Sequence, residues 1–429
     1  MEHKISLEMI GSPQAEAMTD AISTCVHCGF CLPACPTYQL LGEEMDSPRG
    51  RIVLMRGVLE KKLPLVEAAP YLDRCLGCLG CVTACPSGVK YGELITSFRA
   101  HTETKRRRPF FDSLARKMAS TTLPNPDRFR WAAWMGRWVQ PFAFLFPSSI
   151  GAMLRLVPHE IARQQSLEEF YPAIGVKRGC VGMLIGCVQQ AIAPEINQAT
   201  LQVLRRNGFD VVIPKRQSCC GALHMHTGEA QRARLLAAMN FDLFDERVEC
   251  IITNAAGCGS AMKEYELLFH DHDLEEKAKR FSSRIQDISQ FLSKYPLEPF
   301  QSSGAPVRIA YHDACHLAHA QGIAAEPRQL LSSIPGVEVV EIPDGEICCG
   351  SAGTYNIEQP DIARELGNRK AKNIHDLKVD AVVTGNIGCM VQLRKHLAEI
   401  DRKRPLPVMH TVEFLETAYD GKFAERFRR

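Results

Sequence analysis

The chain lacks the motifs by which a sequence usually reveals a bound nucleotide or a serine nucleophile. It contains no Gly-x-Gly-x-x-Gly run after a strand, no Walker loop and no nucleophile elbow. No stretch approaches eighteen consecutive apolar residues, so no transmembrane helix is expected. The segment from Met1 to Met18 has no apolar centre and no cleavage pattern, which argues against a secretory signal peptide. The formal charge of +2 neither favours nor excludes a polyanionic partner.

Cysteine, by contrast, is abundant. The 429 residues include 18 cysteines, a number that would suggest disulfides in a small secreted protein. Because no secretory signal is visible, we expect a reducing, cytoplasmic compartment in which the cysteines are metal ligands or buried thiols. A chain of this length is typical of about three domains.

Eight cysteines form two copies of one pattern, Cys-x2-Cys-x2-Cys-x3-Cys-Pro, near the start of the sequence. Thiolates at this spacing are typical of [4Fe-4S] clusters, and in two-cluster ferredoxins the fourth cysteine of each run binds the other cluster. The alternative is a pair of zinc knuckles, although these usually use two separated Cys-x2-Cys pairs. We predict two [4Fe-4S] clusters. The first ferredoxin set is Cys25, Cys28, Cys31 and Cys85, and the second ferredoxin set is Cys75, Cys78, Cys81 and Cys35.

The remaining two thirds of the chain is duplicated. Two series of four cysteines follow each other in the same order, and matched members lie about 130 residues apart. The tails also correspond, since residues 285–295 resemble residues 408–419. We define the first CCG set as Cys187, Cys219, Cys220 and Cys258, and the second CCG set as Cys315, Cys348, Cys349 and Cys389.

Strands alternate with helices in each copy, which indicates parallel βαβ units. In the first copy we expect strands at residues 181–185, 211–213 and 250–253, and helices at 194–206, ended by Gly208, and at 229–245. In the second copy we expect strands at 307–311, 337–342 and 381–384. Ligands gather at the carboxyl ends of such strands, and the CCG cysteines follow those ends. Each CCG set therefore predicts a metal site formed by four thiolates.

The alternative for the CCG sets is a group of small buried thiols, which adjacent Cys-Cys pairs at matched positions make less favourable. Cys180 and Cys250 have no duplicated partner, and for them we expect a buried thiol. Histidines near the motifs could be further ligands or proton carriers, but we leave them out of the ligand sets. These histidines are His224, His226, His312, His316 and His319.

The segment between the two regions is basic and contains every tryptophan. Ten Lys or Arg residues stand against three acids from Arg99 to Arg137, and the tryptophans are Trp131, Trp134 and Trp138. This composition suits peripheral contact with a membrane surface or a docking helix. An ordinary linker with a helix packed on the next domain is the alternative, because prolines interrupt the segment. No nucleic-acid partner is expected, since no binding module surrounds the basic residues.

Three stretches carry a resemblance to a family. They are CVHCGFCLPACPTYQLLGEEMDSPRGRIVLM (25–55), CCGALHMHTGE (219–229) and YHDACHLAHAQGI with ICCGSAGTYN (311–323 and 347–356). The chain resembles the iron-sulfur subunit of bacterial glycolate oxidase, and more broadly the CCG-domain subunits of heterodisulfide reductase, anaerobic glycerol-3-phosphate dehydrogenase and lactate-utilisation complexes.

The resemblance implies an oxidoreductase complex in which a separate flavoprotein oxidises glycolate to glyoxylate. This chain would pass the electrons towards a quinone, at the cytoplasmic face of the inner membrane, and would not oxidise glycolate alone. No flavin is expected on the chain itself, and no catalytic residue is predicted. The alternatives are a lactate or glycerol-3-phosphate dehydrogenase subunit, a CCG-type disulfide reductase, or a metal-binding scaffold.

The predicted fold class is a multidomain α+β protein with a helical two-cluster ferredoxin-like domain and a duplicated α/β CCG domain. We expect the ferredoxin-like domain at 1–104, a basic helical linker at 105–178, and the CCG repeats at 179–300 and 301–429. The heterodisulfide reductase pattern has a fifth cysteine per copy, but Ala261 and Gln392 occupy that position here. This departure argues against a five-thiolate noncubane cluster and against disulfide reduction at these sites. The alternatives are a four-cysteine iron-sulfur cluster, another metal, or a cysteine site without metal.

Overall fold

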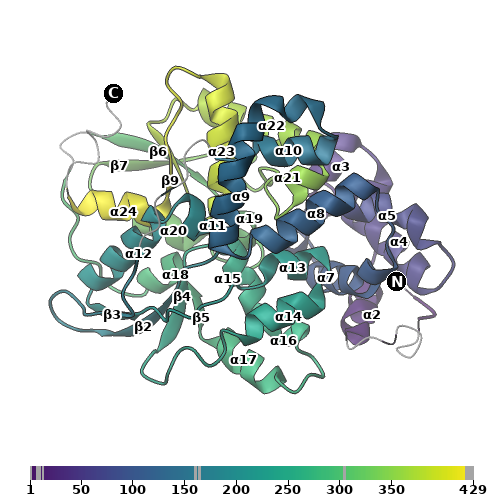
Figure 1. The fold of residues 1–429 in the computed structure, drawn as a ribbon, viewed down its shortest axis with the longest axis horizontal. Coiled ribbons are helices and arrows are strands. Elements are labelled where there is room, and N and C mark those ends of the chain that lie inside the picture. The colour runs from purple at the N-terminus through teal and green to yellow at the C-terminus, as the bar shows by residue number, and fades with distance from the viewer. Residues whose placement is uncertain are drawn as a thin grey trace.

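A computed structural model describes residues 2–5, 11, 14–158, 162, 166–302 and 306–420. Figure 1 shows a helical amino-terminal part beside two units in which helices surround a sheet. This architecture confirms the predicted fold class. Parts of the predicted linker and of the second repeat fall on residues 159–161, 163–165, 303–305 and 421–429, which lie outside the described residues.

Short helices build the amino-terminal part around an apolar core. Helices α2 and α7 pack together, and Met18, Ile22, Leu94 and Phe98 are buried in that core. The start of α4 is fixed locally because the side chain of Ser47 accepts a hydrogen bond from the backbone of the first turn. The elements are α2 (Ala15–Thr24), α3 (Pro36–Leu41), η1 (Glu44–Asp46), α4 (Pro48–Leu59), α5 (Leu65–Asp73), α6 (Gly80–Thr83), α7 (Tyr91–Thr102) and η2 (Glu103–Lys105).

The basic segment forms α8 (Phe110–Thr122), α9 (Pro126–Val139), η3 (Gln140–Leu145) and α10 (Ser148–Arg155). Asn125 caps α9 by accepting hydrogen bonds from its first turn, and Pro126 occupies the first helical position. The prolines therefore separate short helices. Within the described residues, no helix combines the length and the apolar character that crossing a bilayer requires.

The first CCG copy contains a sheet with strand order β1-β3-β2-β4-β5. All neighbours are parallel except β1, which pairs antiparallel with β3 at the edge. The strands are β1 (Phe170–Tyr171), β2 (Gly179–Leu184), β3 (Phe209–Val212), β4 (Cys250–Thr253) and β5 (Ile285–Asp287). The helices are α11 (Val188–Ile192), α12 (Glu195–Arg206), α13 (Ala222–Thr227), α14 (Ala230–Ala238), α15 (Ala256–Lys263), α16 (Tyr265–Leu268), α17 (Glu275–Ser283) and α18 (Ile288–Leu292).

The second copy repeats this topology in the order β7-β6-β8-β9, with every neighbouring pair parallel. These strands correspond one to one with β3-β2-β4-β5, so the duplication seen in the sequence is also a duplication of the fold. The strands are β6 (Val307–His312), β7 (Val337–Glu341), β8 (Ala381–Thr384) and β9 (Val408–His410). The helices are α19 (Cys315–Ala318), α20 (Ala325–Ser332), α21 (Tyr355–Glu358), α22 (Pro360–Asp376), α23 (Ile387–Ile400) and α24 (Thr411–Tyr419).

The two copies pack on each other reciprocally. Helix α12 of the first copy contacts α24 of the second, and α20, which corresponds to α12, contacts α18, which corresponds to α24. One apolar core runs through both copies and includes Phe209, Phe291 and Phe414. This arrangement holds the two CCG regions in a fixed relation, because separating them would expose the shared core to water.

One predicted helix is shorter than expected. We predicted a helix over 229–245, but α14 ends at Ala238. Asn240 is fully buried just beyond this end, where its side-chain oxygen accepts a hydrogen bond from the backbone N–H of Ser218. The chain therefore leaves the helix to support the loop that carries Cys219 and Cys220.

Candidate metal centres

The two ferredoxin loops have the same backbone conformation. Positive φ values occur at matched positions, at His27 and Gly29 in the first run and at Gly77 and Leu79 in the second. Such left-handed residues turn the chain sharply and let it wrap around a compact group. The two runs therefore share one loop conformation.

The members of the first ferredoxin set line one pocket. Three of them come from the first run, and Cys85 reaches the pocket from the second run, as does Cys81 of the second ferredoxin set. Burial raises the pKa of Cys31 to about 11, so the thiol by itself stays protonated at neutral pH. Metal binding favours the thiolate, so a bound metal would cause Cys31 to lose its proton at neutral pH.

The second ferredoxin set lies deeper. Burial raises the pKa of Cys81 well above its ordinary value, and the neighbouring thiols of Cys78, Cys75 and Cys35 raise it further. Cys31 of the first run also raises the pKa of Cys81, so both Cys31 and Cys35 lie near the cysteines of the second run. Four soft donors in an enclosed space fit an iron-sulfur cluster.

A buried arginine stands beside this second set. Arg51 donates hydrogen bonds to Asp46, at 3.1 Å, and to Thr37, at 3.0 Å, and its Nη1 lies 3.8 Å from Sγ of Cys35. Burial alone would raise the pKa of Cys75, but the positive charges of Arg51 and Arg99 lower it. The sequence did not lead us to predict a role for Arg51, although a charged side chain on the buried face of α4 was the available signal.

The first CCG set gathers at the carboxyl ends of β2, β3 and β4. Cys187 caps α11, Cys219 and Cys220 lie in the loop after β3, and Cys258 lies on α15. The sulfurs of Cys187 and Cys219 are 3.4 Å apart. Hydrogen bonds from Cys187 and Cys220 lower the pKa of Cys219 well below its usual range, so the loop stabilises a thiolate.

The second CCG set occupies the equivalent place after β6, β7 and β8. The sulfurs of Cys315 and Cys348 are 3.9 Å apart, and hydrogen bonds from Cys348 and Cys389 lower the pKa of Cys349. Among the histidines left out of the ligand sets, His312 lies with Cys349 and Cys389 so that their donor atoms are all within 4.8 Å of one another.

Glycine is required in both CCG motifs. Gly221 and Gly350 have φ values of +77° and +88°, which favour glycine. A Cβ atom at Gly221 would lie 2.9 Å from the carbonyl oxygen of Ala233, and one at Gly350 would lie 2.7 Å from that of Ala363. The glycines therefore let α14 and α22 pack directly against the two cysteine loops.

The positions of the missing fifth cysteines do not offer a ligand. Ala261 is fully buried in an apolar cluster. The side chain of Gln392 donates a hydrogen bond to the carbonyl of Ala363 and accepts one from Asn356. Cys180 and Cys250 lie at the amino ends of β2 and β4, away from the CCG sets, and burial raises the pKa of Cys250 to about 12.

The second ferredoxin set and the second CCG set are neighbours. Leu76 packs in one apolar cluster with Cys315, Cys348 and Tyr355, and Cys78 borders that cluster. The hydroxyl of Tyr355 donates a hydrogen bond of 2.9 Å to the carbonyl of Arg74. The helical part therefore meets the duplicated part where two cysteine sets come together.

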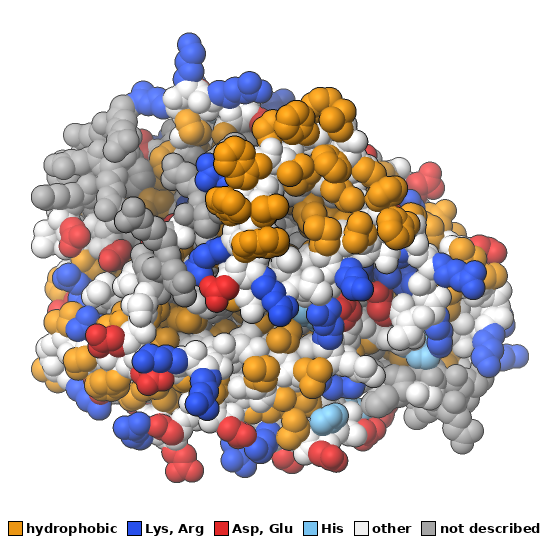
Figure 2. Space-filling model, viewed as in Figure 1, with side chains coloured by type: hydrophobic (Ala, Val, Ile, Leu, Met, Phe, Trp, Pro, Cys, Tyr) orange, Lys and Arg blue, Asp and Glu red, His pale blue; other side chains and the backbone are white. Residues whose placement is uncertain are grey.

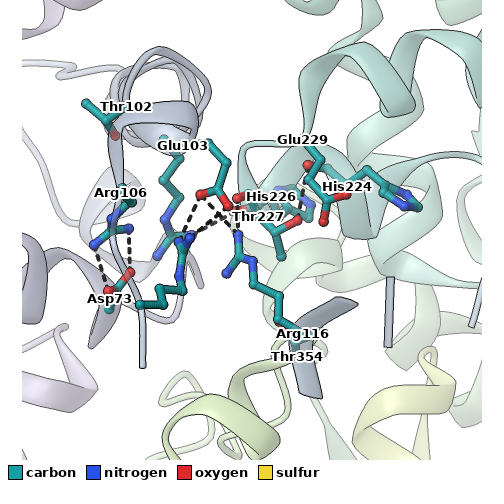
Figure 3. Close-up of polar contacts among 12 residues, drawn as sticks. Asp73, Thr102, Glu103, Arg106, Arg116, His224, His226, Thr227, Glu229 and Thr354 are labelled. Carbon is teal, nitrogen blue, oxygen red and sulfur yellow. Dashed lines mark hydrogen bonds and ion pairs between the residues drawn. The ribbon is translucent and has the colours of Figure 1, made fainter. Parts of the chain in front are cut away.

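Ion pairs surround this junction (Figure 3). Arg106 binds both carboxylate oxygens of Asp73 at 2.6 Å. Arg116 of α8 pairs with Glu103, and it donates a hydrogen bond to the carbonyl of Thr227. Arg116 also pairs with Glu358. Thr227 belongs to the first CCG copy and Glu358 to the second, so the contacts of the buried Arg116 connect the basic segment to both copies.

Comparisons with known proteins agree with these parts. Residues 21–89 match the model of the 4Fe-4S dicluster domain, and residues 181–263 and 309–394 match the model of the cysteine-rich CCG domain.

The similarity to curated proteins extends over the whole length. The glycolate oxidase iron-sulfur subunit of Escherichia coli K12 is 35% identical over 98% of this chain and 100% of that protein. The probable glycolate oxidase iron-sulfur subunit of Bacillus subtilis 168 is 33% identical over 93% of this chain and 94% of its own length. Lactate utilization protein A of Oceanobacillus iheyensis is 29% identical over 57% of this chain and 99% of that protein. The chain therefore belongs to the family of glycolate oxidase iron-sulfur subunits, and it is an electron-transfer subunit of an oxidoreductase.

Proposed function

We propose that this chain relays single electrons from a partner flavoprotein that oxidises glycolate to glyoxylate towards a quinone. The observation that carries the proposal is the contact between Cys78, of the second ferredoxin set, and the cluster that holds Cys315 and Cys348 of the second CCG set. Close packing of redox centres is what a relay needs. Lactate is the second candidate substrate, because lactate utilization protein A is similar to 57% of this chain.

Two [4Fe-4S] clusters, one on each ferredoxin set, are part of the proposal, as are metal centres on the CCG sets. When bound, such clusters accept and release one electron at a time. The pocket that Cys25, Cys28, Cys31 and Cys85 line supports the first ligand set. The proposed domains are a ferredoxin-like domain at 1–104, a linker at 105–178, and repeats at 179–300 and 301–429.

The positions of the sets support a direction of transfer. Cys28 is exposed, and Val26 and Phe30 beside it are 67% and 66% exposed, a suitable surface for the flavoprotein. Cys187 of the first CCG set lies at the start of α11, which packs under α9. We therefore expect electrons to enter at the first ferredoxin set and to leave near α9.

The outer face of α8, α9, η3 and α10 is the proposed contact with the membrane. Figure 2 shows a wide apolar patch on this face, with basic side chains along its lower border. Exposed tryptophan and phenylalanine beside exposed Lys117, Arg128 and Arg137 suit the interface of an anionic bilayer. The quinone is dissolved in that bilayer. The apolar patch comprises Phe110, Phe111, Leu114, Met118, Trp131, Trp134, Met135, Trp138, Phe142, Phe144, Leu145 and Phe146. We place the protein at the cytoplasmic face of the inner membrane.

The proposal is tested with the complex purified anaerobically together with its flavoprotein. Replacing Cys28 with Ala should leave reduction of the flavin by glycolate intact and abolish turnover with a quinone analogue. Cys250→Ala is the matched control, because Cys250 is a buried thiol remote from the cysteine sets, and it should retain quinone turnover. If the Cys28→Ala complex lacks that cluster but turns over with the quinone analogue, the relay is wrong.

A further inference from the structure

The second CCG copy contains one potential donor that the first copy lacks. His312 is the last residue of β6 and is 1% exposed. Its Nδ1 atom is buried and has no hydrogen-bond partner among the described residues. A buried polar atom without a partner is energetically unfavourable, so a ligand bound at this atom would remove that penalty.

The surroundings of the ring are those of a metal ligand. One ring nitrogen of His312 and the sulfurs of Cys349 and Cys389 are all within 4.8 Å of one another. Ligands about 2.0–2.3 Å from a single metal ion lie somewhat less than 4 Å apart, so small side-chain movements suffice for joint binding. Cys389 is already oriented, because the side-chain amide of Asn386 donates to its sulfur at 3.4 Å.

The first copy provides an internal comparison. Leu184 ends β2 at the position that corresponds to His312, and its side chain cannot bind a metal. Within the described residues, the close trio of donors in that copy is His270, Asp271 and Glu275, which lies apart from the first CCG set and includes the exposed Asp271, and no histidine forms such a trio with the cysteines of the first CCG set. Another buried histidine, His224, directs its Nε2 atom to the carbonyl of Ser120, at 3.0 Å.

We propose that His312 is a metal ligand in the second CCG copy, where it joins the four thiols of the second CCG set. The two copies then hold unequal centres, one bound by cysteine alone and the other by cysteine and a neutral imidazole. The chemistry required of the metal is affinity for thiolate and imidazole together, which iron in a cluster and zinc both have. This inference rests on the proposed metal centres of the CCG sets.

The test uses the full chain, purified anaerobically after labelling with 15N-histidine. We compare wild type with His312→Leu, which imitates Leu184, and with His312→Cys, which offers a thiolate instead. Iron and zinc contents, zinc-edge X-ray absorption and pulsed EPR report which metal is present and whether nitrogen binds it. His224→Leu is the matched control in the first copy.

We expect a histidine nitrogen at the metal in wild type and in His224→Leu. Retention of the second-copy metal against a chelator should fall about tenfold or more in His312→Leu. His312→Cys should keep the metal but lose the nitrogen signal, which guards against misfolding of the leucine variant. The ferredoxin signals should persist in each variant.

Three results would overturn the inference. They are an unchanged nitrogen signal in both His312 variants, equal metal retention in wild type and His312→Leu, and no metal at all in the second copy of wild type. Cys389→Ser separates this failure from failure of the proposed centre. If that variant loses the metal while both His312 variants keep it unchanged, the cysteine set stands and only the role of His312 falls.

Discussion

The Nδ1 atom of His316 lies 2.8 Å from the hydroxyl of Ser260, which joins the helices that carry Cys315 and Cys258. The Nε2 atom of the same ring lies 3.0 Å from the carbonyl of Gly77, in the second ferredoxin loop. Burial lowers the pKa of His316, so the ring is neutral at pH 7. It then donates from Nε2 to Gly77 and accepts at Nδ1 from Ser260. One imidazole therefore connects three parts of the chain.

Replacing His316 with Ala should lower the free energy of unfolding by about 1–3 kcal/mol, because two polar groups at a half-buried junction lose their partner. His319 is the matched control. It binds Thr83 and the carbonyl of Glu346 in a more exposed position, so His319→Ala should cost less than about 1 kcal/mol. Anaerobic thermal unfolding, followed by circular dichroism, measures both. Equal losses in the two variants would contradict the central role of His316.

The interleaved assignment of the ferredoxin cysteines predicts how their variants pair. Cys85→Ser should disturb the same EPR signal as Cys28→Ser, because both side chains line one pocket. Cys35→Ser should disturb the other signal, together with Cys78→Ser. Low-temperature EPR of the reduced protein distinguishes the two signals. If Cys85→Ser instead groups with Cys78→Ser, each run binds its own cluster.

The apolar patch should bind lipid vesicles. Replacing Trp131, Trp134 and Trp138 with Ser should weaken binding to vesicles of phosphatidylcholine and phosphatidylglycerol at least about tenfold, because each buried indole contributes roughly 1 kcal/mol or more. Co-sedimentation measures the effect.

A control variant changes three side chains that are equally exposed but lie outside the patch. Val176, Leu235 and Met239 are 85%, 70% and 60% exposed, and their replacement by Ser should leave vesicle binding unchanged. If the tryptophan variant keeps its affinity for vesicles but loses the flavoprotein, the patch is a protein interface instead.

The stability of the chain should depend on pH through Glu264. Burial, with a smaller contribution from Glu93, raises its pKa from 4.5 to about 7. The unfolded chain releases this proton more readily, so stability falls as the pH rises from 4.5 to about 7 and stays low above it. Glu264→Gln cannot ionise. Its stability relative to wild type should therefore increase by about 1 kcal/mol between about pH 6 and about pH 8.

Denaturant unfolding at the two pH values measures this difference. Glu266→Gln changes an exposed carboxylate on the neighbouring helix and should show no such increase. A constant difference between Glu264→Gln and wild type across this range would show that Glu264 is ionised in the folded protein at the lower pH.

Local patterns in the sequence predicted the parallel strands well. Apolar β-branched runs such as residues 250–253 and 381–384 became β4 and β8 with the expected bounds, since their burial on both faces leaves little choice. Because the strands are parallel, the loops that follow them lie at one edge of the sheet. The cysteines in those loops therefore gather there.

Contacts between distant segments could not be predicted in this way. The end of α14 depends on Asn240, which supports a loop 22 residues earlier in the chain. The place of His312 beside Cys349 and Cys389 depends on β6, α23 and the loop between β7 and α21 at once. A single sequence gives no sign of which of several nearby histidines faces the cysteines.

The buried position of Arg116 has a practical consequence for anyone who wants a detergent-free sample. The exposed aromatic side chains of α8 share their helix with this arginine, whose ion pairs reach Glu103 and Glu358. Excising the helix would leave Glu358 without its buried counter-ion and would uncover the junction beneath. A water-soluble form should therefore be sought by substituting the outward-facing residues one at a time, with the helix itself kept in place.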